Sequence, residues 1–216
     1  MKTNEAVRSI VDALKALYPD GICSLNYEKD YELLFSVRLA AQCTDERVNK
    51  VTPALYARFP TLEDLAGADV AEVEQYIHST GFFRAKARDI VRASQMLLRD
   101  YGGKVPGTME ELLKLPGVGR KTANVLGAVL WQKEVMPVDT HVFRVSNRIG
   151  LTTNSKTPLQ TELTLEKNIP SHLLPVAHHW LILHGRYVCM ARSPKCGECG
   201  IAAWCRKYAA DHRTKG

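Results

Sequence analysis

The chain has 216 residues, 45% of them hydrophobic, which is enough for one large or two small globular domains. Its 29 basic and 23 acidic residues give a formal net charge of +6, which suits a polyanionic partner but also fits a surface of solvated lysines. No stretch reaches the roughly 18 to 20 apolar residues that cross a bilayer, and the N-terminus has no signal-peptide core. We therefore expect a cytoplasmic protein.

The hydrophobic pattern is helical almost throughout, with little strict apolar–polar alternation. The first helix is amphipathic, and one stripe of it carries Val7, Ile10, Val11, Leu14 and Leu17. Further helices are expected at residues 31–41, in two short pieces within 61–77 with the second starting near Asp69, and at 85–99, 108–115, 120–131, 139–150, 159–167 and 176–187. About ten helices with short connections predict an all-α protein, in which a parallel sheet has no place.

The predicted helix at residues 85–99 is amphipathic and basic. Its inward face is expected to hold Ile90, Val91, Met96 and Leu97. Its basic residues are expected to face solvent or phosphate: Arg84, Lys86, Arg88 and Arg92.

A glycine hairpin, Pro116-Gly117-Val118-Gly119, joins the predicted helices at 108–115 and 120–131. Glycines permit positive φ and close backbone approach, and successive N–H groups at the start of a helix make an anion site, here next to Arg120. Because the backbone would make the contact, such a hairpin grips phosphate without reading sequence. Taken alone, the hairpin fits a plain tight turn between two helices equally well.

Four cysteines close the chain in one run: Cys189, Cys196, Cys199 and Cys205, with six, two and five residues between them. In a cytoplasmic protein a metal explains clustered cysteines better than disulfides do. Four thiolates at this spacing can hold a cubane iron–sulfur cluster or a zinc ion, and the spacing leaves both open.

These motifs resemble the endonuclease III family, DNA glycosylases of the helix–hairpin–helix superfamily. The resemblance covers residues 31–205, and its segments are LAAQCTD (39–45), LPGVGRKTA (115–123), VDTH (138–141), HHWLILHGRYVC (178–189) and the cysteine run. It implies a two-domain helix–hairpin–helix fold and a 4Fe–4S cluster held by all four cysteines. It also implies a bifunctional DNA glycosylase and AP lyase of base excision repair that acts on oxidised pyrimidines.

Lys121 follows the hairpin, and Asp139 lies eighteen residues further on. A neutral lysine amine can attack a sugar carbon and hold it as an imine, but at pH 7 only about one free lysine in 2,500 is neutral, a penalty of about 4.6 kcal/mol. The start of a helix and the adjacent Arg120 both disfavour the ammonium form. From the residues alone, the simpler interpretation is that Lys121 binds phosphate and Asp139 is a helix cap. The resemblance implies that they are the catalytic lysine and aspartate: the lysine attacks C1′, and β-elimination then nicks the strand.

Chemistry on a duplex base requires the nucleotide to be extruded, and other side chains must fill the gap. By resemblance these are Gln42 and Phe82, although the family often has leucine at the second position and Phe82 could simply be core. Related adenine-mismatch glycosylases usually carry a catalytic glutamate in the helix before the glutamine, where this chain has only Arg38. This difference favours oxidised pyrimidines as substrates.

Basic residues surround the start of the cysteine run: Arg186, Arg192 and Lys195. We expect them to lie near DNA phosphates, although a solvated basic loop would look the same. Three histidines share one predicted helix, His178, His179 and His184, and we expect structural roles for them rather than metal binding.

The expected domains are residues 25–135, a helical bundle with the hairpin, and residues 1–24 plus 136–216, which carry the cluster. Lys121 and Asp139 then come from different domains, and we expect the active site in the cleft between them. The partner is expected to be double-stranded DNA with damaged or abasic sites, bound by a monomer. The alternative is a non-catalytic iron–sulfur protein that binds damaged or abasic DNA without cutting it.

Overall fold

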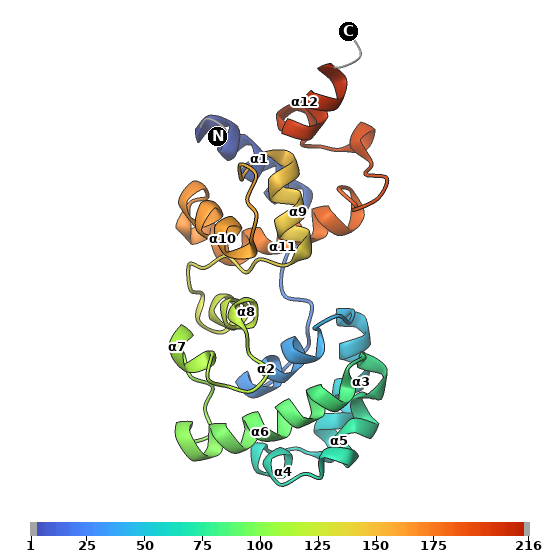
Figure 1. Cartoon of the computed structure of the whole chain (residues 1–216), viewed down its shortest axis with the longest axis vertical. Coiled ribbons are helices and arrows are strands. Elements are labelled where there is room, and N and C mark those ends of the chain that lie inside the picture. The colour runs from blue at the N-terminus through green and yellow to red at the C-terminus, as the bar shows by residue number, and fades with distance from the viewer. Residues whose placement is uncertain (1–3, 214–216) are drawn as a thin grey trace. The chain divides into compact units, whose positions relative to one another are not determined.

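The computed structural model describes residues 4–213, and every regular element in this range is a helix (Figure 1). None of these helices is both long and apolar enough to span a bilayer. The chain forms two compact units, one of Met1–Cys23 with Gln132–Gly216 and one of Ser24–Trp131. Each unit is described separately below.

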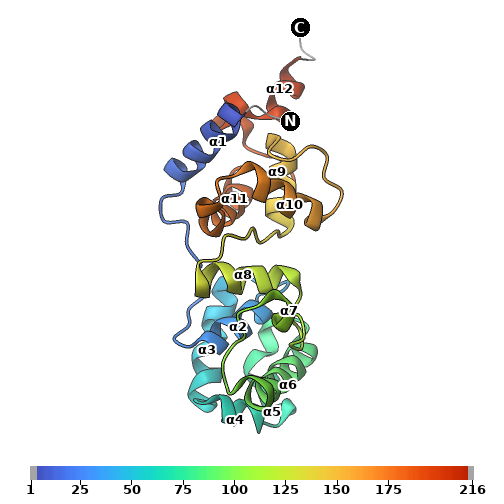
Figure 2. The same ribbon diagram turned by 90° about the vertical axis from the view of Figure 1, so that its left-hand side faces the viewer.

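The unit of residues 24–131 is built on the long helix α6, Phe83–Tyr101. Helix α6 packs on α4 and α5, which it crosses in Figure 1, and also contacts α2. The other helices of this unit are α2 (Asp30–Leu39), α3 (Asp45–Arg58), α4 (Leu62–Ala66), α5 (Val70–Ile77), the 3-10 turn η1 (His78–Thr80), α7 (Met109–Leu112) and α8 (Arg120–Trp131). Helix α8 lies on α2 (Figure 2).

Side-chain caps set the starts of several helices in this unit. The side chains of Thr44, Thr61, Asp69 and Thr108 each accept a hydrogen bond from a backbone N–H in the first turn of the helix that follows. The cap at Asp69 confirms the predicted second short helix, which is α5. Helix α6 ends at Gly102, whose φ of 58° a residue without a Cβ adopts at little cost.

The other unit packs around a hydrophobic core to which helices α1, α9 and α11 contribute most of the residues. Its helices are α1 (Asn4–Leu17), α9 (Thr140–Ile149), α10 (Pro158–Asn168), η2 (Ser171–Leu173), α11 (Leu174–Tyr187), η3 (Cys196–Glu198), η4 (Ala202–Trp204) and α12 (Arg206–Arg213). Helices α9 and α11 pack tightly where Gly185 meets His141, since a Cβ on Gly185 would lie 3.0 Å from two atoms of that histidine. Only glycine permits so close an approach without a shift of α9.

The structure confirms the all-α class and departs from the expected helix boundaries at a few places. The predicted helix at 120–131 matches α8, whereas the one at 108–115 ends at Leu112 and continues as turns. Helices α3 and α12 were not predicted. Leu17, assigned to the buried stripe of the first helix, is 46% exposed.

Candidate functional site

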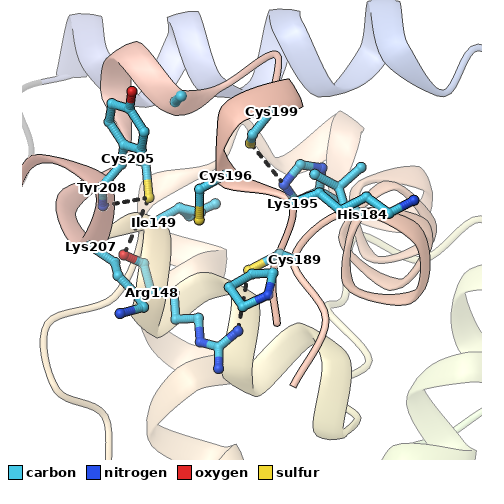
Figure 3. A pocket seen from close by; sticks show the side chains of 13 residues that line it. Arg148, Ile149, His184, Cys189, Lys195, Cys196, Cys199, Cys205, Lys207 and Tyr208 are labelled. Atoms are coloured by element: carbon cyan, nitrogen blue, oxygen red, sulfur yellow. Dashed lines mark hydrogen bonds between the residues drawn. The ribbon is translucent and has the colours of Figure 1, made fainter. Parts of the chain in front are cut away.

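The four clustered cysteines line one cavity of about 360 Å³, its open mouth included (Figure 3). Their sulfur atoms surround this cavity, and none of the four is in a disulfide. They lie in the cysteine loop, which we define as residues 189–205. Within residues 4–213, no three histidine, cysteine or acidic side chains are grouped so as to hold a single metal ion.

Three N–H groups lie against three of these sulfurs. The guanidinium Nη1 of Arg148 donates to Cys189 Sγ at 3.7 Å, and the backbone N–H of Tyr208 donates to Cys205 Sγ at 3.5 Å. The ring nitrogen Nε2 of His184 lies 3.6 Å from Cys199 Sγ. Donors placed in this way favour the thiolate, the form that ligates a metal centre, while burial opposes this at Cys199 by raising the pKa of its thiol.

His184 is fully buried beside the cysteine loop. Burial lowers its pKa to about 4, so the ring is neutral at pH 7. The Tyr18 hydroxyl lies 3.1 Å from Nδ1, and burial raises the pKa of Tyr18 to about 12, so this phenol keeps its proton. A ring protonated at Nε2 satisfies both contacts, because it accepts from Tyr18 and donates to Cys199.

Two arginines of α9 hold the cysteine loop by its backbone. Arg144 Nη2 donates to the carbonyl oxygens of Gly185 at 2.9 Å and Cys189 at 3.2 Å. Arg148 donates to the carbonyl oxygens of Met190 at 2.6 Å and Ala191 at 2.9 Å. The start of the cysteine loop is therefore fixed to the helix that begins after Asp139.

Asp139 is the N-cap of α9, as predicted. Its Oδ1 accepts a hydrogen bond from the backbone N–H of Val142 at 2.7 Å, which fixes the orientation of the half-buried carboxylate. Among the described residues, Oδ2 makes no hydrogen bond or ion pair. One oxygen of this carboxylate is therefore held while the other is available to a ligand.

The glycine hairpin lies over an ion pair between α2 and α6. Gly117 adopts φ 75°, and a Cβ there would lie 2.5 Å from Arg38 Nε and 2.7 Å from Asp89 Oδ2. Arg38 in turn binds Asp89 Oδ2 through Nε at 2.8 Å and through Nη2 at 2.7 Å. The ion pair thus supports the hairpin from below and occupies Arg38 in a structural contact.

Some of the other hairpin residues are buried and the rest are exposed. Val118 is 9% exposed and Pro116 is half-buried, whereas Gly119 and Arg120 are exposed. Lys121, the second residue of α8, is also exposed, and no carboxylate of the described residues pairs with its amine.

Gln42 and Phe82 share an unusual backbone. Their φ angles are 55° and 49°, in the left-handed region that residues other than glycine rarely adopt. Both are exposed, and Phe82 is 68% exposed, so the reading of Phe82 as core is wrong. A bulky apolar residue that is both strained and exposed points to a role outside the folded core. We call Gln42 and Phe82 the gap-filling pair, after the role predicted for them from the sequence.

Lys86 departs from its predicted place. It was expected to face solvent or phosphate, yet it is 1% exposed. Its Nζ donates to the carbonyl oxygens of Leu39 at 2.8 Å and Thr80 at 2.7 Å. Arg84, Arg88 and Arg92 of the same helix are exposed, as predicted.

The basic residues around the cysteine loop are on the surface. Arg186, Arg192 and Lys195 are all exposed, and Lys195 also lines the mouth of the cavity. Its backbone N–H donates to the carbonyl of Val188 at 3.0 Å, which closes the first part of the loop.

Similarity to known proteins identifies the family of this chain. Residues 35–171 match the HhH-GPD superfamily of base excision DNA repair proteins, and residues 189–205 match the iron–sulfur binding domain of endonuclease III. Endonuclease III of Synechocystis sp. is 50% identical over 193 residues, 89% of this chain and 88% of that one. The chain belongs to the endonuclease III family.

Other relatives agree. Endonuclease III of Bacillus subtilis is 43% identical over 91% of this chain and 90% of its own. The solved structure of a trapped endonuclease III–DNA covalent intermediate is 42% identical, with a TM-score of 0.92 over 99% of this chain and 100% of that one. A thermostable thymine-DNA glycosylase, 23% identical over 96% of this chain and 98% of its own, shares the fold with a TM-score of 0.85.

This member of the endonuclease III family is a base excision repair glycosylase with AP lyase activity, and it carries a 4Fe–4S cluster. The structure fits the cluster: four free cysteines line one cavity, and N–H groups lie against three of their sulfurs. Cys189, Cys196, Cys199 and Cys205 would hold it. When bound, the cluster supplies a rigid, covalently tied core for a loop that has little hydrophobic content of its own.

Several residues at these sites were missed or misplaced by sequence reasoning. Arg144 and Arg148 belong to no motif. The one sequence signal is their spacing of four residues, which places them on the same face of a helix. His184 was expected to be structural, and the structure adds its contact with Cys199. The burial of Lys86 depends on α2 and η1, and no local pattern could reveal it.

Proposed function

We propose that Lys121 is the nucleophile and Asp139 the proton-handling carboxylate of this glycosylase and AP lyase. Lys121 Nζ attacks C1′ of the damaged nucleotide as the base leaves with the electron pair of the glycosidic bond. Nitrogen then loses a proton, and its lone pair breaks the C1′–O4′ bond to give the protonated imine while O4′ takes up a proton. Removal of a C2′ proton then breaks the C3′–oxygen bond, so that the 3′ phosphate leaves and the strand is nicked. Asp139 takes up protons and stabilises positive charge on the sugar.

The observation that supports Lys121 most directly is its amine, which lies exposed in the first turn of α8 without a carboxylate partner among the described residues. A lysine held in an ion pair would first have to break it before attacking. A related endonuclease III has been trapped as a covalent intermediate with DNA, which supports a nucleophile of this kind in the present chain. Asp139 has one fixed oxygen and one available oxygen, which suits a carboxylate that must exchange a proton.

Three groups of residues would bind the DNA. The hairpin residues Pro116, Gly117, Val118, Gly119 and Arg120 would grip a phosphate through backbone N–H groups and the start of α8. Gln42 and Phe82 would fill the gap left by the extruded nucleotide. Arg186, Arg192 and Lys195 would add phosphate contacts beside the cysteine loop.

Oxidised pyrimidines are the proposed lesions, because Arg38 occupies the position of the glutamate that adenine-mismatch enzymes use. In this chain Arg38 is bound to Asp89 beneath the hairpin, so its side chain has a structural role there. We also propose that the enzyme acts as a monomer on damaged or abasic duplex DNA, at the nucleoid in the cytoplasm. The units of residues 1–23 with 132–216 and of residues 24–131 would be its two domains.

Borohydride trapping tests the assignment of the nucleophile. Borohydride reduces an imine to a stable amine, so wild type with its cluster verified should form a covalent adduct with a thymine-glycol duplex. Lys121→Ala should form none, and Lys104→Ala, at an exposed lysine of the same unit, should behave as wild type. An adduct of equal yield with Lys121→Ala would overturn the assignment. A wild-type protein that binds these duplexes and cuts none would instead be the non-catalytic DNA-binding protein.

A further inference from the structure

Lys86 is a buried lysine without a carboxylate partner among the described residues. Its side chain is 1% exposed, and its nitrogen donates to two backbone carbonyls, those of Leu39 and Thr80. Burying an ammonium is costly unless hydrogen bonds replace its water. Burial also lowers the pKa of Lys86. A buried lysine at this position needs a structural reason, since an apolar residue would pack there without the cost of burying a charge.

The two carbonyls that Lys86 binds are at helix ends. Leu39 is the last residue of α2, and Thr80 is the last residue of η1. The final carbonyls of a helix have no partner inside it, and they carry the negative end of the helix dipole. One cation therefore caps two helix ends at once and fixes the distance between them.

Each capped end leads directly into a member of the gap-filling pair. Gln42 lies three residues after Leu39, and Phe82 lies two residues after Thr80. Both have left-handed backbone, which costs of order 1 kcal/mol or more for a residue with a side chain. Such a conformation persists only where the surrounding structure imposes it. The bonds of Lys86 fix the two helix ends from which these segments begin.

We propose that Lys86 is a positioning residue for base extrusion: it joins the ends of α2 and η1 so that Gln42 and Phe82 enter the DNA helix as one rigid pair. The inference rests on the proposed function of those two residues. Lys86 itself contacts no DNA, because its nitrogen is enclosed within the unit of residues 24–131.

Lys86→Met tests this, since methionine keeps most of the volume and removes the donors. On an abasic duplex the single-turnover cleavage rate should fall about tenfold or more, as expected when two buried carbonyls lose their donor. On single-stranded abasic DNA there is no duplex gap to fill, so the rate should fall less than about threefold. Lys104→Met makes the same change at an exposed lysine and should leave both rates unchanged.

If Lys86→Met unfolds at the wild-type temperature and lowers both rates equally, the inference is overturned. An unchanged duplex rate would overturn it too. If wild type cleaves neither substrate, the proposed function fails instead, and the two failures are thus distinguishable.

A double-mutant cycle supplies an independent check. If Lys86 acts through the gap-filling pair, Lys86→Met should add less than about threefold to the loss already caused by Gln42→Ala with Phe82→Ala. An equal factor in both backgrounds would contradict a positioning role. Lys86→Gln keeps N–H donors on a shorter side chain and should give intermediate duplex rates, so the cycle can be run with it should the methionine variant not fold.

Discussion

Arg148 holds Cys189 both at its sulfur and through the residue that follows. Its Nη1 lies 3.7 Å from Cys189 Sγ and 2.6 Å from the carbonyl oxygen of Met190. One guanidinium therefore neutralises ligand charge and fixes the first turn of the cysteine loop. Because Arg148 belongs to α9, the helix capped by Asp139 is directly bonded to the cluster-binding segment.

The first prediction concerns Arg148→Met, which should weaken retention of the cluster. A hydrogen bond from a charged group contributes about 2 kcal/mol to stability. The variant should therefore lose its visible iron–sulfur absorbance more than about tenfold faster than wild type in the presence of a chelator. Arg8→Met, at an exposed arginine of α1 in the same unit, is the matched control and should lose the cluster at the wild-type rate. Equal bleaching rates for Arg148→Met and wild type would show that the guanidinium is not needed.

The second prediction separates the two roles of Asp139. Asparagine caps a helix as well as aspartate does, so Asp139→Asn should unfold at the wild-type temperature while its cleavage rate falls about 100-fold or more. Asp139→Ala should show the same loss of rate and also lose about 1 kcal/mol of stability, because Val142 N–H loses its acceptor. Thermal unfolding and single-turnover cleavage measure the two effects. Full activity in Asp139→Asn would reduce Asp139 to a helix cap.

The sequence predicted the elements whose signals are local. Asp139 and Gly150 delimit α9 as expected, because a capping carboxylate and a glycine at φ 92° act within one turn. Helix α3 was missed, and it has Pro53 in its interior, a residue that usually ends a helix. The short helix α7 was predicted too long, since the chain turns after Leu112 to reach the hairpin.

The candidate site was predictable where a motif carries the chemistry and not where tertiary packing does. The four cysteines and the hairpin are contiguous in sequence, so their grouping follows from their spacing. The contacts of Lys86 join segments 47 and 6 residues away, and those of the Arg148 guanidinium reach up to 43 residues along the chain. A cation on a helix looks solvent-exposed by pattern alone, and only the packed neighbours decide otherwise.

The third prediction uses the contrast between the two hairpin glycines. Gly117→Ala would force a Cβ into the Arg38–Asp89 ion pair at φ 75°, so the variant should lose about 2 kcal/mol of stability and also bind abasic duplex more weakly. Gly119→Ala meets nothing within 4 Å and should fold normally. Its added methyl group would lie on the exposed surface and should weaken only DNA binding. Chemical denaturation and fluorescence anisotropy distinguish the two, and equal stabilities would contradict the contact beneath Gly117.

The last prediction is that Phe82 lowers the stability of the fold and raises the cleavage rate. Phe82 is 68% exposed and therefore buries little apolar surface, while its backbone at φ 49° is strained. Phe82→Gly should therefore leave the free energy of unfolding unchanged or raise it by up to about 1 kcal/mol, because glycine adopts this backbone freely. The same variant should cleave thymine-glycol duplex about tenfold more slowly, since no side chain fills the gap that extrusion leaves. Phe82→Leu keeps an apolar group at that place and should retain most of the rate. If Phe82→Gly were instead clearly destabilised, with its cleavage rate intact, Phe82 would be a packing residue and the gap would be filled by another side chain.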